Sequence, residues 1–287
     1  INVFVVALIT LTMIYPMWYI IIVSIATPEE AALGGIYLWP ETISFEAYQN
    51  VFKNQDIWLS YANTVLYTVA HTIYVLLLTI PAAYTLSKKQ LPGRVVITWY
   101  FFITMFLSGG LIPSYILNRN LGLVNSRWIM ILGMGIGYSN LIITRTYFQT
   151  SIPNELQEAA YIDGCNNIRF FLRIVLPNAT TIIAVIGLFY AVDHWLSYWN
   201  AMLYITDETR YPLQLVLRDI LLKAEVALQS AQSGENMESA TAVVDLLRIS
   251  ESVKYIVVIA GTLPLLIVFP FVEKYFVKGV MIGSVKG

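Results

Sequence analysis

Long apolar runs separated by shorter polar stretches set the pattern of this chain. A helix needs about 20 apolar residues to cross the hydrocarbon core of a bilayer, and six runs reach that length. They cover residues 3–26, 61–86, 95–117, 128–148, 179–205 and 253–272. Because a helix satisfies its own backbone hydrogen bonds in lipid, the pattern predicts an all-α, polytopic membrane protein. We expect six transmembrane helices in a single transmembrane domain, residues 1–287.

Composition supports a bilayer as the solvent of this chain. Hydrophobic residues make up 57% of it and charged residues 12%, whereas soluble domains carry about 25% charged residues. The first run is too long for the core of a signal peptide, and no cleavage pattern follows it. We therefore expect it to be retained as a span.

The placement of lysine and arginine predicts which side of the membrane each loop faces, because short cytoplasmic loops carry an excess of these residues. Eight lie in loop 87–94, in loop 149–178 and in the C-terminal tail: Lys88, Lys89, Arg94, Arg169, Arg173, Lys274, Lys278 and Lys286. Three lie in the loops 27–60 and 118–127: Lys53, Arg119 and Arg127. Both termini and loop 149–178 are therefore expected in the cytoplasm. The loops 27–60 and 206–252, each with a net charge of −4, are expected outside it.

Several classes of function are disfavoured by the composition. A net charge of −1 gives no electrostatic basis for binding nucleic acid. One cysteine, Cys165, excludes an internal disulfide or a thiolate metal cage, and two histidines, His71 and His194, argue against a zinc site. The chain lacks the sequence G-x-x-x-x-G-K-[S/T], whose backbone cradles phosphates. We therefore expect no cofactor, metal or ATP site in this chain, and no ATPase activity of its own.

The polar segment between the fourth and fifth runs, residues 149–178, contains a short predicted helix. Pro153 suits the first helical position, and Glu155 and Glu158 fall in the first turns, where the helix dipole favours acids. Gly164 suits the left-handed residue that follows a helix. The predicted helix has about 11 residues and is too short to span a bilayer.

A second, amphipathic helix is predicted directly after the first. Ile168, Phe171, Leu172 and Val175 recur at helical spacing and form one apolar face. We expect this helix to lie against the membrane or the bundle and to stop at Pro177. A cytoplasmic hairpin at the membrane surface, with no partner, would have the same pattern.

The whole of residues 158–177, EAAYIDGCNNIRFFLRIVLP, resembles the EAA loop of ABC-importer permeases. The positions that match the family's pattern are Glu158, Ala159, Ala160, Asp163, Gly164, Ile174, Leu176 and Pro177. The stretches 81–94, PAAYTLSKKQLPGR, and 271–287, FVEKYFVKGVMIGSVKG, also resemble permeases of the maltose type. Residues 189–205 and 211–221 resemble the subgroup that handles larger oligosaccharides, such as fragments of pectin or alginate.

This resemblance implies a type I ABC-importer permease fold in a bacterial inner membrane. The EAA segment would transmit motion from a separate ATPase. The implied partners are two copies of an ATP-binding subunit, which hold ATP and Mg²⁺, a second related permease and an extracytoplasmic solute-binding protein. The implied substrate is a sugar, an oligosaccharide in this subgroup, with acidic fragments among the candidates.

Polar and aromatic residues near the fifth run are candidates for lining a substrate path. Ionisable residues at membrane depth suggest function, aromatic faces stack on sugar rings, and amides and carboxylates bind hydroxyls. The candidates are Asp193, His194, Trp195, Tyr198, Trp199 and Asn200, with Asn63 and His71 from the second run. Trp and Tyr also form interfacial belts, and Asp193 can simply pair with His194. Because neighbouring residues point about 100° apart on a helix, at most one of these two is expected to face the path.

Two other classes of function remain open at this stage. An ion-coupled secondary transporter could use Asp193 and His194 as a proton relay. An intramembrane enzyme acting on glycans is a weaker alternative, because the sequence shows no convincing pair of nucleophile and base.

Overall fold

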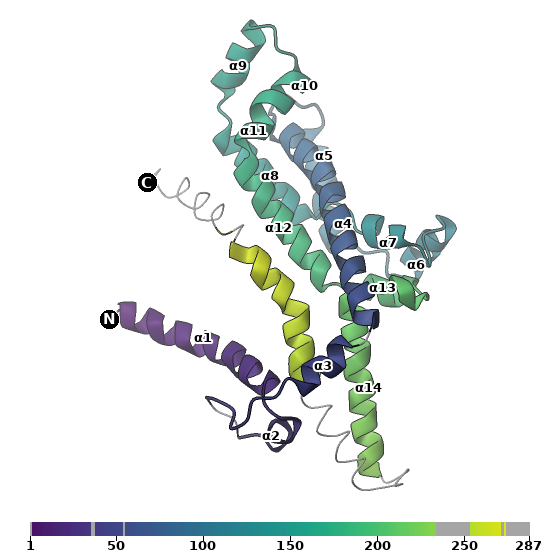
Figure 1. Cartoon of the computed structure of the whole chain (residues 1–287). Helices are drawn as coiled ribbons and strands as arrows, with labels where there is room; N and C mark the ends of the chain where they lie inside the picture. The colour runs from purple at the N-terminus through teal and green to yellow at the C-terminus, as the bar shows by residue number, and fades with distance from the viewer. Residues whose placement is uncertain (1, 36–37, 54, 234–252, 271–272, 274–287) are drawn as a thin grey trace. The chain divides into compact units, whose positions relative to one another are not determined.

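The computed structural model describes residues 2–35, 38–53, 55–233, 253–270 and 273, and these residues are almost entirely helical (Figure 1). They divide into two compact units. The first comprises Ile1–Thr64 and Glu208–Ile267, and the second Val65–Asp207 and Val268–Gly287. Most of the C-terminal motif predicted at 271–287 lies outside the described residues.

The first unit combines the N-terminal part of the chain with residues 208–267. Its helices are α1 (Asn2–Ser24), α2 (Pro28–Leu33), α3 (Glu46–Phe52), the first turns of α4 (Gln55–Ser87), α14 (Leu213–Ser233) and most of the helix Val253–Pro270. Tyr19 of α1 packs edge-on against Tyr255, with ring centroids 6.1 Å apart. The hydroxyl of Tyr61 donates to the carbonyl of Ala260. Contacts between α1, α4 and the helix Val253–Pro270 therefore hold this unit together.

The second unit contains the rest of α4 and the segment predicted to be cytoplasmic. Its other helices are α5 (Arg94–Phe106), α6 (Leu111–Asn120), α7 (Arg127–Leu132), α8 (Tyr138–Ser151), α9 (Asn154–Ile162), α10 (Asn167–Phe170), α11 (Leu176–Asn178), α12 (Thr180–Leu196) and α13 (Trp199–Tyr204). Within this unit α9 and α10 lie at one end and α7 and α13 at the other (Figure 1). Helices α4, α8 and α12 run between the two ends.

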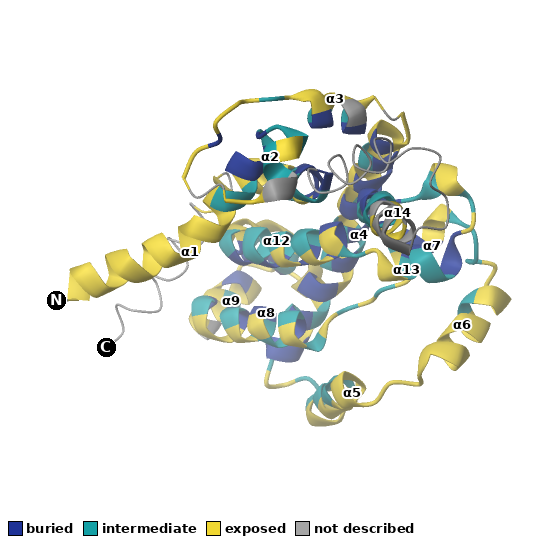
Figure 2. Ribbon diagram, turned by 90° about the horizontal axis from the view of Figure 1, so that it is seen from below, coloured by how far each residue is buried: buried dark blue, intermediate teal, exposed yellow. Residues whose placement is uncertain are grey.

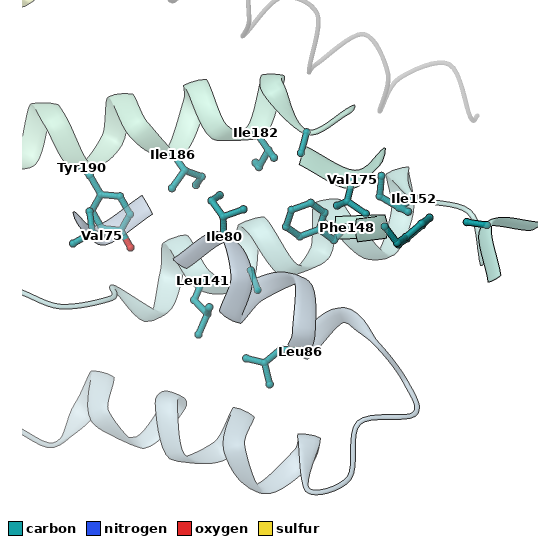
Figure 3. Close-up of a cluster of buried hydrophobic side chains, with 14 residues drawn as sticks. Val75, Ile80, Leu86, Leu141, Phe148, Ile152, Val175, Ile182, Ile186 and Tyr190 are labelled. Carbon is teal, nitrogen blue, oxygen red and sulfur yellow. The ribbon is translucent and has the colours of Figure 1, made fainter. Parts of the chain in front are cut away.

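Helices α4, α8 and α12 pack around a common apolar core. Figure 3 shows Ile182 and Ile186 of α12 near Ile80 of α4, with Leu141 and Phe148 of α8 beside them. The core continues to the polar segment 149–178 through Ala160, Phe170 and Val175. Since lipid is as apolar as these side chains, close packing rather than escape from water stabilises such contacts in a membrane.

Several helices leave their apolar side chains open. None of the residues of α5 or α6 is buried, and in α1 only Ile22, Val23 and Ser24 are buried (Figure 2). Apolar surface of this extent requires lipid or another protein against it. The exposure agrees with a chain that crosses a membrane.

The predicted count of six spans is not confirmed. Among the described residues, three helices are each long and apolar enough to cross a bilayer: α1, α4 and Val253–Pro270. Two bent pairs raise the number to at most five. In the predicted span 95–117, α5 and α6 meet at an angle of 113°. Gly110, at the start of α6, has φ +85°, a backbone conformation that favours glycine and interrupts the helix.

The predicted spans 128–148 and 179–205 are also interrupted. The first is divided into α7 and α8 by residues 133–137, which include three glycines. The second is divided after Leu196, where Ser197 adopts an extended backbone, and α13 follows. Glycine has a low helix propensity, a feature that counting apolar residues over a window does not register.

Candidate functional site

The first helix of the polar segment, α9, begins one residue later than predicted and is shorter. Pro153 is the cap residue, with φ −62° and ψ 143°, and Asn154 is the first helical residue. The helix has 9 residues instead of about 11, which corresponds to about 14 Å. Proline fixes φ near this value and lacks an N–H, so it fits either position, and the sequence did not distinguish between them.

The end of α9 forms as predicted. Gly164 has φ +78°. Its N–H donates to the carbonyl of Tyr161 at 3.0 Å, and the N–H of Cys165 donates to that of Ala160 at 2.9 Å. These two bonds make a Schellman motif, which satisfies the last carbonyls of the helix. The motif reverses the chain and allows α10 to return along α9.

The second helix of the segment differs from the prediction. Asn166 caps it, since its side chain accepts from the N–H of Arg169 at 2.8 Å. A π-helical turn, Phe171–Val175, lies between α10 and α11. Pro177 lies within α11, so the helix does not stop there, and the bend of 77° follows at residue 179. A π turn contains one extra residue, and this shifts the buried face.

The shift changes which apolar side chains are covered. Phe170 and Val175 are fully buried, whereas Ile168 and Leu172 are 71% and 53% exposed. The predicted face therefore survives only at Val175 and, in part, at Phe171. The side chains of Ile168 and Leu172 are left open on the segment's outer surface.

The positions that match the EAA pattern separate into two groups. The buried or half-buried positions are Ala160, Ile174 and Leu176. The exposed positions are Glu158, Ala159, Asp163, Gly164 and Pro177. Ala160 and Ile174 belong to the core that α4, α8 and α12 share. The segment is thus anchored through one face and presents an acidic, thin-sided surface on the other.

A polar network joins α9 to the end of α4. The Nζ atom of Lys88 donates to Oε1 of Gln157 at 2.5 Å and lies 4.7 Å from the ring centroid of Tyr84. Gln157 donates to the hydroxyl of Tyr161, which donates to Asn167. Burial lowers the pKa of Lys88 below the ordinary lysine value. One chain of contacts therefore joins α4, α9 and α10.

A cavity of about 560 Å³ lies beside this network. Its lining comes from the end of α4, loop 87–94 and segment 149–178. The lining residues are Tyr84, Thr85, Lys88, Gln90, Leu91, Gln157, Glu158, Tyr161 and Asn167. Glu158 of the EAA pattern thus faces the same space as Lys88. The cavity therefore lies between the end of α4 and helix α9, which Lys88 and Gln157 still join.

The predicted path residues of the fifth run do not form one cluster. Asp193 is exposed and His194 is 4% exposed, so the two point in different directions, as predicted. Trp195 is buried in α12. Tyr198 and Trp199, after the break, are 37% and 51% exposed, and Asn200 is half-buried.

Asn63 serves to hold a loop of its own unit. Its Nδ2 donates to the carbonyls of Thr209 and Tyr211 at 2.9 and 3.2 Å. The next residue, Thr64, accepts from the N–H of Leu213 at 2.7 Å. Because both hydrogens of the amide are used within the protein, this placement favours an anchoring role over the predicted contact with substrate.

The two histidines, which the sequence offered as separate candidates, lie together. Their rings stack with centroids 4.4 Å apart and planes inclined by 28°. Nδ1 of His71 lies 2.8 Å from the carbonyl oxygen of Ile131, and Nε2 of His194 lies 2.7 Å from that of Met130. A carbonyl only accepts hydrogen bonds, so each of these nitrogens carries the hydrogen. Both histidines therefore act as donors to the end of α7.

Comparison with known proteins decides the family. Residues 57–282 match the family described as "Binding-protein-dependent transport system inner membrane component". The chain belongs to this family. Protein LplC of Bacillus subtilis is 39% identical to this permease over 96% of the chain and 90% of its own length. The polygalacturonan/rhamnogalacturonan transport system permease protein YtcP, also of B. subtilis, is 38% identical over 96% and 93%.

A solved structure supports the same assignment. A bacterial ABC transporter involved in the import of the acidic polysaccharide alginate contains a chain that is 31% identical to this permease. The TM-score is 0.80, and the match covers 96% of this permease and 95% of that chain. The all-helical, multi-pass fold is thus that of an ABC-importer permease.

Family membership settles several of the open questions. The permease is a subunit of a binding-protein-dependent ABC sugar importer of the inner membrane. ATP is bound and hydrolysed on separate subunits, and a solute-binding protein delivers the substrate. This decides against the ion-coupled secondary transporter. Among the described residues no group of three or more His, Cys, Asp and Glu could hold a metal ion.

Sequence reasoning missed the residues that connect elements far apart in the chain. Lys88 was counted only for its charge, although it joins α4 to α9. Tyr190, which bonds Thr79 at 3.1 Å and accepts from the N–H of Gly137 at 3.2 Å, was not considered. A tyrosine one turn before His194 on an apolar helix was the available signal.

Proposed function

We propose that residues 149–178 are the coupling segment through which ATP hydrolysis on a separate subunit drives this permease. The observation that supports this most directly is the division of the EAA positions into an anchored and an exposed group. Ala160 and Ile174 pack into the core of α4, α8 and α12, while Glu158 and Asp163 remain open. A force applied to the exposed face would therefore move the helices that the anchored face contacts.

The exposed face of α9 has the size and chemistry of a helix that inserts into a groove on an ATPase. Helix α9 is about 14 Å long, and Ala159 keeps one side of it thin. Ile162, which is 87% exposed, and Ile168 lie close to the Schellman turn. Their open apolar side chains would be buried when an ATPase surface covers the segment.

We propose the complete assembly that the resemblance implies. Two ATP-binding subunits, which hold ATP and Mg²⁺, a second related permease and an extracytoplasmic solute-binding protein would join this chain. The exposed apolar faces of α5 and α6 suit a second permease and the surrounding lipid. The acidic loops 27–60 and 206–252 would face the binding protein.

The proposed orientation places both termini and the coupling segment in the cytoplasm. The excess of lysine and arginine in loops 87–94 and 149–178 supports it. The internal arrangement of the second unit agrees, because α9 and α10 lie at the end opposite to α7 and α13 (Figure 1). Loop 118–127, which precedes α7, would then lie outside.

We infer that the substrate is an oligosaccharide, with acidic fragments of pectin or alginate type as the first candidates. The support is similarity to a permease named for polygalacturonan and rhamnogalacturonan and to an alginate importer. Asp193, Tyr198, Trp199 and Asn200 are the path candidates whose side chains are exposed or half-buried. Competition of uptake by oligogalacturonate against neutral oligosaccharides of equal length tests this choice, and equal competition by both would contradict it.

A charge reversal at Glu158 tests the coupling role. We expect Glu158→Lys to reduce uptake about tenfold or more, because the reversal places a cation on the face that meets the ATPase. ATP hydrolysis by the complex should persist, so that fewer sugars are imported per ATP. Glu273→Lys, the same reversal at an exposed position outside the coupling segment and the loops assigned to the binding protein, is the control and should import normally. Unchanged uptake in Glu158→Lys would contradict the proposal.

A further inference from the structure

The predicted fourth span is interrupted at residues 133–137, between α7 and α8. The last carbonyls of a helix lack partners within it. At membrane depth such a group is costly if it stays unsatisfied, and irregular backbone is tolerated only where other groups cover it. The carbonyls of Met130 and Ile131, at the end of α7, are groups of this kind.

Two buried histidines from different helices satisfy these carbonyls. His71 of α4 is 2% exposed and His194 of α12 is 4% exposed. Their donor nitrogens lie 2.8 and 2.7 Å from the oxygens of Ile131 and Met130. Stacking of the two rings fixes both donors against successive carbonyls. We call this arrangement the histidine clamp.

The two histidines lie at the same predicted depth. His71 is 10 residues from residue 61, the outer end of its predicted span, and His194 is 11 residues from residue 205, the outer end of its own. The count applies to His71, because α4 is continuous, and it gives about 15 Å below the outer edge of a core about 30 Å thick. For His194 the helix ends at Leu196, and its depth follows from the stacking of its ring on that of His71.

The other side of the break is held by the same helix, α12. The N–H of Gly137, before α8, donates to the hydroxyl of Tyr190 at 3.2 Å, and Tyr190 bonds Thr79 of α4 at 3.1 Å. Tyr190 and His194 are four residues apart and so share one face of α12. Between these fixed ends, Gly135 has open space where a Cβ would lie.

We propose that His71 and His194 are positioning residues for transport, which hold the broken fourth span as a hinge. They act as hydrogen-bond donors, since each donor nitrogen points at a carbonyl oxygen, which only accepts. The clamp holds the end of α7, and Tyr190 holds residue 137 before α8, so a change in backbone conformation of this span is confined to the residues between these two points. This rests on the proposed function, because the hinge operates in alternating access.

Matched substitutions separate the donor from the ring. Asn at position 71 places an N–H donor where Nδ1 was, and Gln at position 194 places one where Nε2 was. His71→Asn and His194→Gln should retain uptake within about threefold of wild type. His71→Phe and His194→Phe keep an aromatic ring but no donor, and should reduce uptake by about tenfold or more in the assembled complex.

A conformational readout distinguishes hinge control from a general loss of stability. In a Cys165→Ser background, Gly135→Cys is labelled with a membrane-impermeant maleimide in the full complex. ATP with the loaded binding protein should change the labelling rate severalfold, and the Phe variants should abolish that change. A rate that stays constant in all states, or that changes equally in the Phe variants, would overturn the proposal.

The remaining outcomes test the clamp and the proposed function separately. If the Phe variants do not assemble, His71→Asn and His194→Gln are decisive, and loss of uptake in these assembled complexes would overturn the donor role. A complex whose labelling responds to ATP but which imports no sugar would overturn the proposed function and leave the clamp standing. Normal import by the Phe variants would overturn the clamp and leave the proposed function standing.

Discussion

Gly164 fixes the turn of the coupling segment through its backbone alone. Its φ of +78° costs about 1–2 kcal/mol for most residues with a Cβ. No atom lies within 4 Å of where its Cβ would be, so space does not require glycine there. The requirement comes from the Schellman motif, in which Gly164 and Cys165 donate to the last carbonyls of α9.

Substitution at Gly164 should therefore depend on the backbone preference of the new residue. Gly164→Pro fixes φ near −65° and removes the N–H that bonds Tyr161, so we expect uptake to fall about tenfold or more while ATP hydrolysis continues. Gly164→Asn, which tolerates the left-handed conformation, should import within about threefold of wild type. Uptake and ATP hydrolysis measured on the same proteoliposomes check this, and equal import by the two variants would contradict it.

Lys88 can be tested against a neighbour of equal charge. Lys88→Met removes the bond to Gln157 and the contact with Tyr84, which together correspond to about 1–2 kcal/mol. We expect fewer sugars imported per ATP and a lower melting temperature of the purified complex. Lys89→Met, at an exposed position, is the control and should change neither quantity. Identical effects of the two substitutions would show that only net charge matters.

At the scale of elements, local signals in the sequence predicted local structure well. The end of α9 was predictable because one glycine after an amphipathic stretch determines it. The π turn at Phe171–Val175 was not, because it depends on packing of Phe170 and Val175 into a core contributed by three other helices. Its extra residue moved the buried face, and it left Ile168 open to solvent or a partner.

Contacts between distant elements were beyond the sequence pattern. The glycines of residues 133–137 interrupt an apolar run that the pattern predicts as one continuous span. His71 and His194 each bond a carbonyl far away in the chain. The acceptor of His71 is 60 residues from it, and the acceptor of His194 is 64 residues from it. No periodicity records such a separation, although both histidines stood out as polar residues in apolar runs.

Helices α4 and α12 approach each other closely at Gly187. A Cβ there would lie 3.3 Å from Cδ1 of Leu76 and 4.0 Å from Cγ2 of Thr72. Gly187→Ala needs only a small shift of Leu76, whereas Gly187→Leu should separate the helices and cost about 1–3 kcal/mol. The melting temperature in detergent should fall for Leu and hold for Ala. Gly109→Leu, where no atom is within 4 Å, serves as control, and an equal loss there would refute the packing argument.

At the scale of the whole molecule, hydropathy predicted the membrane fold but overestimated the number of uninterrupted helices. In the part of the chain that the structure describes, three helices qualify alone and two more as bent pairs, because glycines and extended residues divide runs that are continuous in composition. The exposed faces of α1, α5 and α6 leave this subunit incomplete without lipid and partners. Energy must enter from another chain, since ATP is hydrolysed on separate subunits of this family.

We propose that the energy of ATP hydrolysis enters this permease through the coupling segment 149–178. The most direct measurement is the number of sugars imported per ATP hydrolysed by the reconstituted complex, compared between wild type and Gly164→Pro. We expect ATP-dependent import by the wild type. In the variant, the number of sugars imported per ATP should be lower by about tenfold, with hydrolysis maintained. An unchanged ratio in Gly164→Pro, or wild-type import that needs a proton gradient instead of ATP, would contradict it.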